Sequence, residues 1–561
     1  MLPSVLVLSD FNIGVFERLL RHDVEPPIVS VEAAPFDQVF AELTAGPARP
    51  DTVGVVWVRP EGALPSFRRA LVEGDPLGDE LAAEVDDYAH LLRAFAGRHR
   101  HVLVATFAAP PAHRGLGMLD WRPGTGLRHA VANANVRLAA ALDDVANIHL
   151  LDAEDWLRAG GPQAGSPKQW FTSKVPYVNA VFDAAVADVK AAMRGVAGQA
   201  RKLVVVDLDD TLWGGVVGDV GWQALRLGGH DHLGEAFQDF QRALKALRQR
   251  GVLLGAVSKN SEAVALEAIA SHPEMVLGLD DLAGWRVDWN DKAANVASLV
   301  AELNLGLDAV VFIDDNPAER SRVREALPDV LVPEWPRDPT QFASALRSLR
   351  CFDAPTISDE DRNRTASYAT ERARRAGVAD VGSLDEWLAR LELRVVVAPL
   401  DAANLPRVVQ LLNKTNQMNL TTRRTTEPAL LAWSEQPGHH LVALSVEDRF
   451  GPDGLTGVLG LAVRGDEAHA TDLVLSCRVM GRKIEEAMLH LASACAQRLG
   501  ASTLVLRHLP TDRNGPCLDV LRASALEEVE PHTFVWRSGS PYPNPPFIEL
   551  VDADRAPGAL T

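Results

Sequence analysis

Short apolar runs alternate with longer amphipathic stretches over roughly the first two hundred residues. Four runs predict buried strands: Val5–Leu8, Val53–Val58, His101–Thr106 and Asn147–Leu151. Stretches with helical spacing, such as Asp79–Ala96 and Ala130–Leu142, lie between them. Strands that alternate with helices usually pair in parallel and carry helices on both faces of the sheet. The pattern therefore predicts a doubly wound α/β sheet for this part of the chain.

The same alternation continues in the middle of the chain. Leu203–Val206, Val252–Val257 and Val310–Ile313 are continuous apolar runs bounded by polar turns. Such runs are typical of parallel strands that are buried on both faces. A second parallel sheet is therefore predicted here.

From about Gly382 the pattern changes to strands with short connections. A strand is predicted at Leu393–Val397 and a helix at Leu405–Leu412. The further predicted elements are the strands His440–Val446, Leu455–Val463, Ala470–Ser476 and Thr503–Leu506 and the helix Ile484–Leu499. Neighbouring strands with short connections pair as hairpins, so this part is predicted to hold a mixed sheet.

Length and pattern together predict three domains, because 561 residues correspond to about three domains of ordinary size. The predicted boundaries are 1–198, 199–350 and 381–561, with a charged helical connector over 351–380. Alternating charges are typical of a solvated helix, which is why the connector is set apart. The fold class is α/β throughout.

The composition is that of a globular protein, with 47% hydrophobic and 23% charged residues. The net charge of −19 argues against a nucleic-acid partner, although an acidic carrier protein can still meet a local basic patch. Met1–Leu8 is too short for a signal peptide, and no apolar run reaches the length of a membrane span, so no membrane partner is expected. The four cysteines form no CxxC pair, which favours a reduced, cytoplasmic protein.

Polar groups follow each predicted strand of the middle domain. They are Asp207, Asp209 and Thr211 after the first, Ser258 and Lys259 after the second, Asp314 after the third, and Lys292 before it. Ligands bind at the carboxyl ends of strands in open α/β sheets. Two aspartates at i and i+2 can supply a nucleophile and a general acid, or hold a hard cation. A solvated strand-end turn is the alternative for the aspartates taken alone.

Taken together, these stretches resemble the four motifs of the haloacid-dehalogenase (HAD) superfamily. The resemblance implies that Asp207 attacks phosphorus and that Asp209 acts as general acid and base. It also implies phosphate binding by Thr211, Ser258, Lys259 and Lys292, and Mg²⁺ binding by Asp207, Asp314 and the backbone carbonyl of Asp209. Only 51 positions separate Asp207 from Ser258, and 34 separate Ser258 from Lys292, so no large cap domain fits between them.

In the third part, the order of elements resembles the GNAT acyltransferase fold. Arg478 and Gly481 match the loop that holds a pantetheine cofactor's phosphates in that fold, and Arg482 lies within it, although Lys483 stands where a small residue is expected. Cys477 lies directly before this loop. A helix N-terminus and nearby arginines favour the thiolate, which makes Cys477 a candidate nucleophile. The alternative is a small buried hydrophobe.

A polar block between the first helix and the hairpins of this part holds more amides and hydroxyls than a core element would. Its candidate substrate or carrier contacts are Asn413, Lys414, Asn416, Gln417 and Arg423, together with Asn514 further on. A loop that caps itself with side-chain hydrogen bonds is an equally good interpretation.

The first part weakly resembles the start of SGNH hydrolases, with Ser9 after the first strand, but no late Asp-x-x-His motif follows. Ser9 is therefore expected to cap a helix or line a pocket. An SGNH-like, a HAD and a GNAT-like part in this order resemble the FkbH-like family. The stretches that carry this resemblance are DLDDTLWGGVVGD, VSKN, HPEM, FIDDNPAER, NKTNQMNLTTRR and SCRVMGR, with Asp210 and Met418 as departures.

That resemblance implies transfer of a glyceryl unit from 1,3-bisphosphoglycerate to the phosphopantetheine arm of an acyl carrier protein, with loss of phosphate, in polyketide-type biosynthesis. The cofactor would be Mg²⁺, and Cys477 would carry the glyceryl group as a thioester. Two alternatives stay open. One is a stand-alone Mg²⁺-dependent phosphatase of a small metabolite, and the other is a non-catalytic module that binds a carrier protein.

Overall fold

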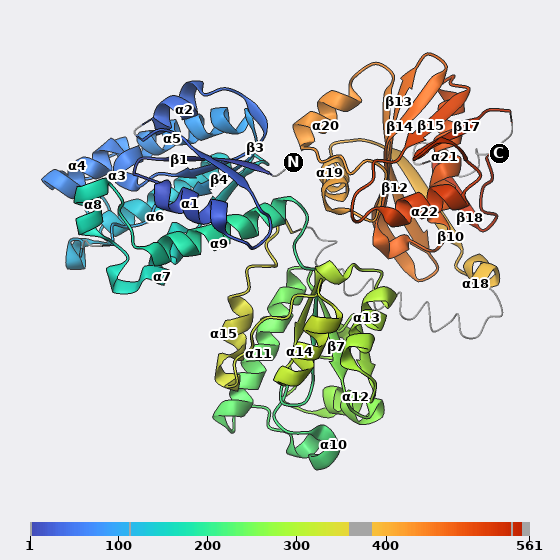
Figure 1. Ribbon diagram of the computed structural model, residues 1–561, viewed down its shortest axis with the longest axis horizontal. Helices are drawn as coiled ribbons and strands as arrows, with labels where there is room; N and C mark the ends of the chain where they lie inside the picture. The colour runs from blue at the N-terminus through green and yellow to red at the C-terminus, as the bar shows by residue number, and fades with distance from the viewer. Residues whose placement is uncertain (1–2, 37, 112–113, 358–383, 540–541, 553–561) are drawn as a thin grey trace. The chain divides into compact units, whose positions relative to one another are not determined.

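The computed structural model describes residues 3–36, 38–111, 114–357, 384–539 and 542–552. They form three β-sheets with helices packed on both faces of each (Figure 1). The predicted multi-domain α/β fold class is confirmed. The chain packs as two compact units, Met1–Val196 with Asp353–Pro355, and Ala197–Phe352 with Thr356–Thr561. The predicted domain boundaries stay predictions, and residues 358–380 of the predicted connector lie outside the described residues.

The first sheet has five parallel strands. In spatial order they are β2 (Ser30–Ala33), β1 (Ser4–Ser9), β3 (Arg49–Trp57), β4 (His99–Ala105) and β5 (Ile148–Leu151). One face packs against α1 (Gly14–His22), α7 (Ala153–Gly160) and α9 (Asn179–Val196). The other face packs against α2 (Val39–Ala45), α4 (Pro65–Glu73), α5 (Glu80–Ala96) and α6 (Leu127–Leu142). Short helices α3 (Pro60–Ala63) and α8 (Pro167–Ser173) follow strand ends or loops.

The second sheet has four parallel strands. Their spatial order is β8 (Gly284–Val287), β7 (Leu253–Ser258), β6 (Leu203–Val206) and β9 (Val310–Ile313). Helices α11 (His232–Gln249), α12 (Glu262–Ser271) and α15 (Phe342–Arg347) cover one face, and α13 (Lys292–Glu302) and α14 (Pro317–Ala326) cover the other. Between β6 and α11, the chain adds the four-residue helix α10 (Val217–Val220) and a 3-10 turn. Among the described residues, no further sheet is inserted between β6 and β8.

The third sheet is mixed and has nine strands. Along its main path the order is β16 (Glu527–Glu530), β17 (Thr533–Arg537), β15 (Thr503–Arg507), β14 (Glu467–Leu475), β13 (Gly451–Arg464), β12 (His439–Asp448), β10 (Leu393–Pro399) and β18 (Ile548–Asp552). The two-residue strand β11 (Met418–Asn419) pairs with β14 off this path. Pairs β14–β15 and β10–β18 are parallel and the other pairs are antiparallel.

Helices cover the two faces of this third sheet separately. One face packs against α18 (Leu384–Arg390), α21 (Ile484–Arg498) and α22 (Gly515–Ala523). The other face packs against α19 (Leu405–Lys414) and α20 (Glu427–Ser434). No helix in the described parts of the chain is long and apolar enough to span a lipid bilayer.

Candidate active site

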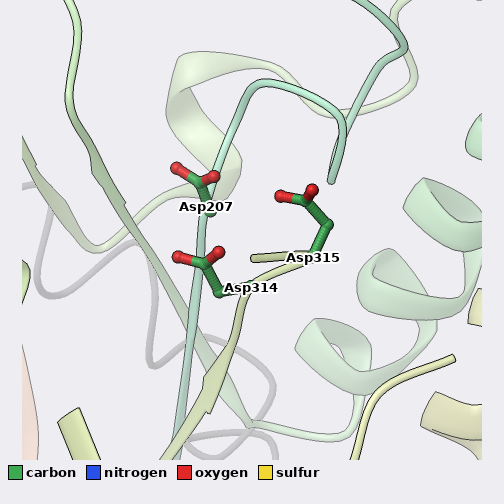
Figure 2. A group of neighbouring side chains, drawn as sticks. All are labelled: Asp207, Asp314 and Asp315. Atoms are coloured by element: carbon green, nitrogen blue, oxygen red, sulfur yellow. The ribbon is translucent and has the colours of Figure 1, made fainter. Parts of the chain in front are cut away.

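Three carboxylates gather at the carboxyl ends of two neighbouring strands of the second sheet. Asp207 follows β6, and Asp314 and Asp315 follow β9, the strand that pairs with β6 in parallel. One oxygen from each lies within 4.8 Å of the others (Figure 2). Parallel pairing places both strand ends at one edge, which is why residues more than one hundred positions apart meet there.

One lysine lies between two of these carboxylates. Lys292 is the first residue of α13, and its Nζ lies 2.9 Å from Asp207 Oδ1 and 2.6 Å from Asp314 Oδ2. Asp207, Lys292 and Asp314 are all buried. Burial raises the pKa of Asp207 to about 7; Lys292 opposes this shift and Asp314 adds to it.

The cluster holds more negative than positive charge. Three carboxylates face one ammonium group, and Asp315 also has a raised pKa because of burial and the nearby Asp314. Hard divalent cations such as Mg²⁺ prefer carboxylate oxygens. The donor set of Asp207, Asp314 and Asp315 therefore fits Mg²⁺. Asp315 is not among the metal ligands predicted from the sequence.

The carboxylate of Asp209 points into a set of hydrogen-bond donors instead of joining the cluster. Its Oδ1 accepts from Trp213 Nε1 at 2.9 Å and from the Val217 amide at 3.0 Å, and its Oδ2 accepts from Asn260 Nδ2 at 2.8 Å. Burial raises the pKa of Asp209, and the bonds from Val217 and Trp213 act against that rise. Sequence reasoning missed Asn260, although it directly follows Ser258 and Lys259 at the end of β7. The metal role predicted for the Asp209 backbone carbonyl stays a prediction.

The other predicted phosphate contacts lie around the same edge. Thr211 is fully buried, and its hydroxyl oxygen accepts from the Asp315 amide at 3.2 Å. Ser258 is buried as the last residue of β7. Lys259 Nζ donates to Glu319 Oε1 at 2.7 Å. Thr211 thus fixes the position of Asp315, and phosphate binding by Thr211, Ser258 and Lys259 stays a prediction.

Cys477 follows β14 in the third sheet and begins a short 3-10 turn, Cys477–Val479. It is partly exposed and lines a pocket together with Arg478, Lys414, Asn416 and Gln417. All four cysteines are free thiols. Burial raises the pKa of Cys495, and that of Cys517 to about 12, which disfavours the thiolate form of both.

Two members of the predicted phosphate loop make internal contacts. Arg482 is 2% exposed, and its guanidinium lies 2.7 Å from Asp453 Oδ2. The Gly481 amide donates to Glu485 Oε1 at 2.7 Å. Arg478 is partly exposed beside Cys477. Of the three predicted loop residues, only Arg478 therefore presents its side chain to the pocket.

The polar block divides between the two interpretations that its sequence left open. Its inner residues cap the chain: Asn413 exchanges two hydrogen bonds with the backbone of Thr425, and Arg423 pairs with Asp472 at 2.6 Å. Its outer residues Lys414, Asn416 and Gln417 line the pocket beside Cys477, and Asn416 also accepts from Arg424.

Asn514, the last of the predicted contacts, is fully buried. It donates to the carbonyls of Asn419 and Leu509 at 3.1 and 2.8 Å, which ties the block to the end of β15.

At the matching edge of the first sheet, Ser9 ends β1 and is buried. Its hydroxyl accepts from the Phe11 amide at 3.2 Å, so it caps a turn before α1 and is not the N-cap of that helix. The neighbouring Asp10 pairs with Arg59 at 2.9 Å, and Arg59 also pairs with Glu61 at 3.0 Å. Asp10, Arg59 and Glu61 thus form an ion-pair network.

No protein-family model matches the chain, and no curated protein matches it. Among solved structures, it is similar to the N-terminal part of the protein BF1531 from Bacteroides fragilis, which contains a phosphatase domain and was crystallised with Mg. The TM-score is 0.57 at 24% identity, over 63% of this chain and 94% of that chain. This similarity supports the fold of the matched part of the chain.

Two weaker similarities are to N-acetyltransferases. The ribosomal-protein-S18-alanine N-acetyltransferase of Escherichia coli matches with a TM-score of 0.20 at 11% identity, over 25% of this chain and 90% of that chain. The PaiA N-acetyltransferase of Thermoplasma acidophilum, in complex with coenzyme A, matches with a TM-score of 0.20 at 13% identity. The match covers 25% of this chain and 96% of that chain. TM-scores this low carry no argument about the third sheet.

Proposed function

We propose that the chain is a Mg²⁺-dependent enzyme of the HAD type that transfers a glyceryl unit from 1,3-bisphosphoglycerate to an acyl carrier protein with loss of phosphate. The observation that carries the phosphatase part is Lys292 between Asp207 and Asp314 at the ends of β6 and β9. This arrangement supplies a nucleophile, a cation and an excess of carboxylates in one buried place. The resemblance of the sequence to the FkbH-like family supports the choice of 1,3-bisphosphoglycerate as donor and of an acyl carrier protein as acceptor.

The C3 phosphate of the donor is an unactivated ester, so its removal needs covalent catalysis. A carboxylate oxygen of Asp207 attacks phosphorus, and the bond from phosphorus to the C3 oxygen breaks. Asp209, which must carry a proton at that moment, gives it to the leaving oxygen. Water then attacks the aspartyl phosphate, Asp209 takes a proton from it, and inorganic phosphate leaves with Asp207 restored.

Three side chains of this chain support that chemistry without reacting. Lys292 neutralises charge on the transferring phosphoryl oxygens, and Asn260 and Trp213 orient the Asp209 carboxyl group. Mg²⁺ held by Asp207, Asp314 and Asp315 would supply charge neutralisation at the same oxygens.

The C1 position of the donor is an acyl phosphate, which a thiolate can displace directly. The sulfur of Cys477 attacks the C1 carbonyl, the bond from C1 to the phosphate oxygen breaks, and a thioester forms with release of phosphate. The thiol of the carrier's phosphopantetheine arm then attacks this thioester, and Cys477 is restored as a thiol. Arg478 and Lys414 line the pocket at Cys477 and favour an anionic donor there. We place this reaction in the cytoplasm and in polyketide-type biosynthesis.

The experiment is to measure the intact mass of an acyl carrier protein after incubation with the full chain, Mg²⁺ and 1,3-bisphosphoglycerate. We expect a glyceryl adduct and release of inorganic phosphate. Cys477→Ala should abolish loading and leave hydrolysis of an aryl phosphate intact, whereas the matched variant Cys351→Ala should load normally. Phosphate release without any adduct would instead indicate a stand-alone phosphatase. Carrier binding with neither reaction would indicate a non-catalytic module.

A further inference from the structure

In the first unit, the loop 114–126 between β4 and α6 carries a cluster of exposed apolar side chains. Met118 is fully exposed, and Leu116, Leu119 and Trp121 are 46%, 43% and 65% exposed. Single exposed apolar residues are ordinary on a protein surface, whereas several together mark a surface that another molecule covers. Methionine and tryptophan are also enriched in protein interfaces. This loop therefore has the composition of an interface.

The loop is braced by one buried carboxylate. Asp120 is 3% exposed, and its Oδ1 accepts from the Leu116 amide at 3.2 Å. Its carbonyl oxygen accepts from the His129 amide of α6 at 3.0 Å. A Cβ at Gly126 would lie 2.0 Å from that same oxygen, so the close turn requires glycine. The apolar side chains thus extend from an ordered backbone, and a partner that binds them loses less entropy than with a loop that must first fold.

The charges around these apolar side chains are positive. Arg114 and Arg122 of the loop and Arg128 on the first turn of α6 are exposed. Asp120, the acidic residue of this stretch, is buried and lies 3.5 Å from Arg128. The whole chain, by contrast, has a net charge of −19.

This contrast favours a small acidic partner. Charges interact over about 8 Å at physiological salt, so a small acidic protein on the loop responds mainly to the local arginines. An extended anionic surface such as a membrane would also meet the other acidic residues of the chain.

We propose that the 114–126 loop, together with Arg128, is a docking surface for an acidic protein partner. The identity of this partner rests on the proposed function: it is the acyl carrier protein, whose protein surface binds the loop independently of its phosphopantetheine arm. The apolar side chains form the buried centre of the interface, and the arginines speed association and orient the partner.

The test is binding and loading of an acyl carrier protein by variants of the full chain. The double substitution Met118→Ser and Trp121→Ser removes the apolar centre, and Arg122→Glu reverses one charge. The matched controls are Val72→Ser, because Val72 is 74% exposed on α4, and Arg100→Glu, because Arg100 is exposed near the start of β4. Titration calorimetry uses the carrier without its phosphopantetheine arm. The loading assay gives KM and kcat for the complete carrier, and circular dichroism checks the fold.

We expect the unchanged chain and both controls to bind the armless carrier. In the double variant and in Arg122→Glu, the Kd and the KM for the carrier should rise by about tenfold or more, while kcat and hydrolysis of an aryl phosphate stay unchanged. The effect of Arg122→Glu should shrink at high salt, unlike that of the double variant.

Two results would overturn the docking surface and leave the proposed function standing: loading without binding of the armless carrier, or an unchanged KM in the loop variants. If the unchanged chain neither binds nor loads the carrier, both proposals fail. Binding to anionic lipid vesicles, or self-association in sedimentation, that the loop substitutions abolish while carrier binding persists would assign the loop to a membrane or to a second copy of the chain. Either result would also overturn the proposal.

Discussion

Replacing Asp207 by asparagine should abolish phosphate release from C3 of the donor, which is an ester, and at the same time stabilise the metal-free protein. Asparagine keeps the shape of the side chain and an oxygen for Lys292, whose Nζ lies 2.9 Å from Asp207 Oδ1. It cannot form an aspartyl phosphate, so hydrolysis of a phosphate ester should fall to background. It also removes one negative charge from a cluster in which three carboxylates face one lysine.

The gain in stability follows from the pKa of Asp207, which burial raises from 3.8 to about 7. A carboxyl group with a raised folded pKa contributes stability at low pH that is lost as pH rises through the folded value. Each unit of this shift corresponds to 1.36 kcal/mol, so ionised Asp207 costs at most about 4 kcal/mol above pH 7. The asparagine variant escapes this cost. Its advantage should therefore be small near pH 4, grow towards pH 7, and level off above it.

The assay is thermal and denaturant unfolding in a Mg²⁺ chelator at several pH values, together with release of inorganic phosphate from an aryl phosphate in Mg²⁺. Added Mg²⁺ should stabilise the unchanged protein more than the variant, because the variant offers one charged ligand fewer. A folded Asp207→Asn protein that releases phosphate at the original rate would refute the nucleophile. A stability difference that does not change between pH 4 and pH 8 would refute the charge argument.

Three further outcomes follow from the same contacts. Asn260→Ala removes one of the three hydrogen-bond donors to Asp209. It should lower the rate of ester hydrolysis by about tenfold to a hundredfold and change the melting temperature only slightly. An unchanged rate would show that Asn260 does not position Asp209. Arg482→Met leaves Asp453 and Asp448 without their arginine and should lower the free energy of unfolding by about 3 to 5 kcal/mol. The control is Arg464→Met, because Arg464 is exposed. Equal effects of the two substitutions would contradict the importance of the buried pair. Chelation of Mg²⁺ should stop ester hydrolysis and re-addition should restore it, as phosphate release measures; hydrolysis that persists in chelator would count against the metal site.

The strands that the sequence predicts best are those that are buried on both faces. The predicted bounds agree with those of β6 (Leu203–Val206) and β9 (Val310–Ile313). A short continuous apolar run is typical of a parallel strand that is buried on both faces. The short strands β2 and β8 are missed. Ser30 and Glu32 of β2 are exposed, and β8 includes the half-buried Trp285 and Arg286, so neither presents a continuous apolar run. Both lie at sheet edges, but so does the correctly predicted β9, so burial of both faces and not edge position separates these strands.

The candidate site was also predictable only in part. The convergence of Asp207, Lys292 and Asp314 is predictable because strand order and the strand-end rule place them at one edge. The hydrogen bond from Asn260 to Asp209 is not predictable from the sequence. It joins the ends of two strands through side chains whose directions residue spacing does not determine. Likewise nothing in the spacing of Gly481 and Glu485 shows that this glutamate turns back to bond the loop amide.

The proposed catalytic cluster carries a larger excess of negative charge than the other buried ion pairs described above. In the third sheet, Arg423 is matched by Asp472, and Arg482 faces Asp453 and Asp448 and donates to a backbone carbonyl. Pairing of this kind lowers the cost of burying a charge. At the ends of β6 and β9, three carboxylates face one lysine, and burial raises the pKa values of Asp207 and Asp315. A buried excess of one sign destabilises the fold, and it persists where a cation and an anionic substrate restore the balance during function.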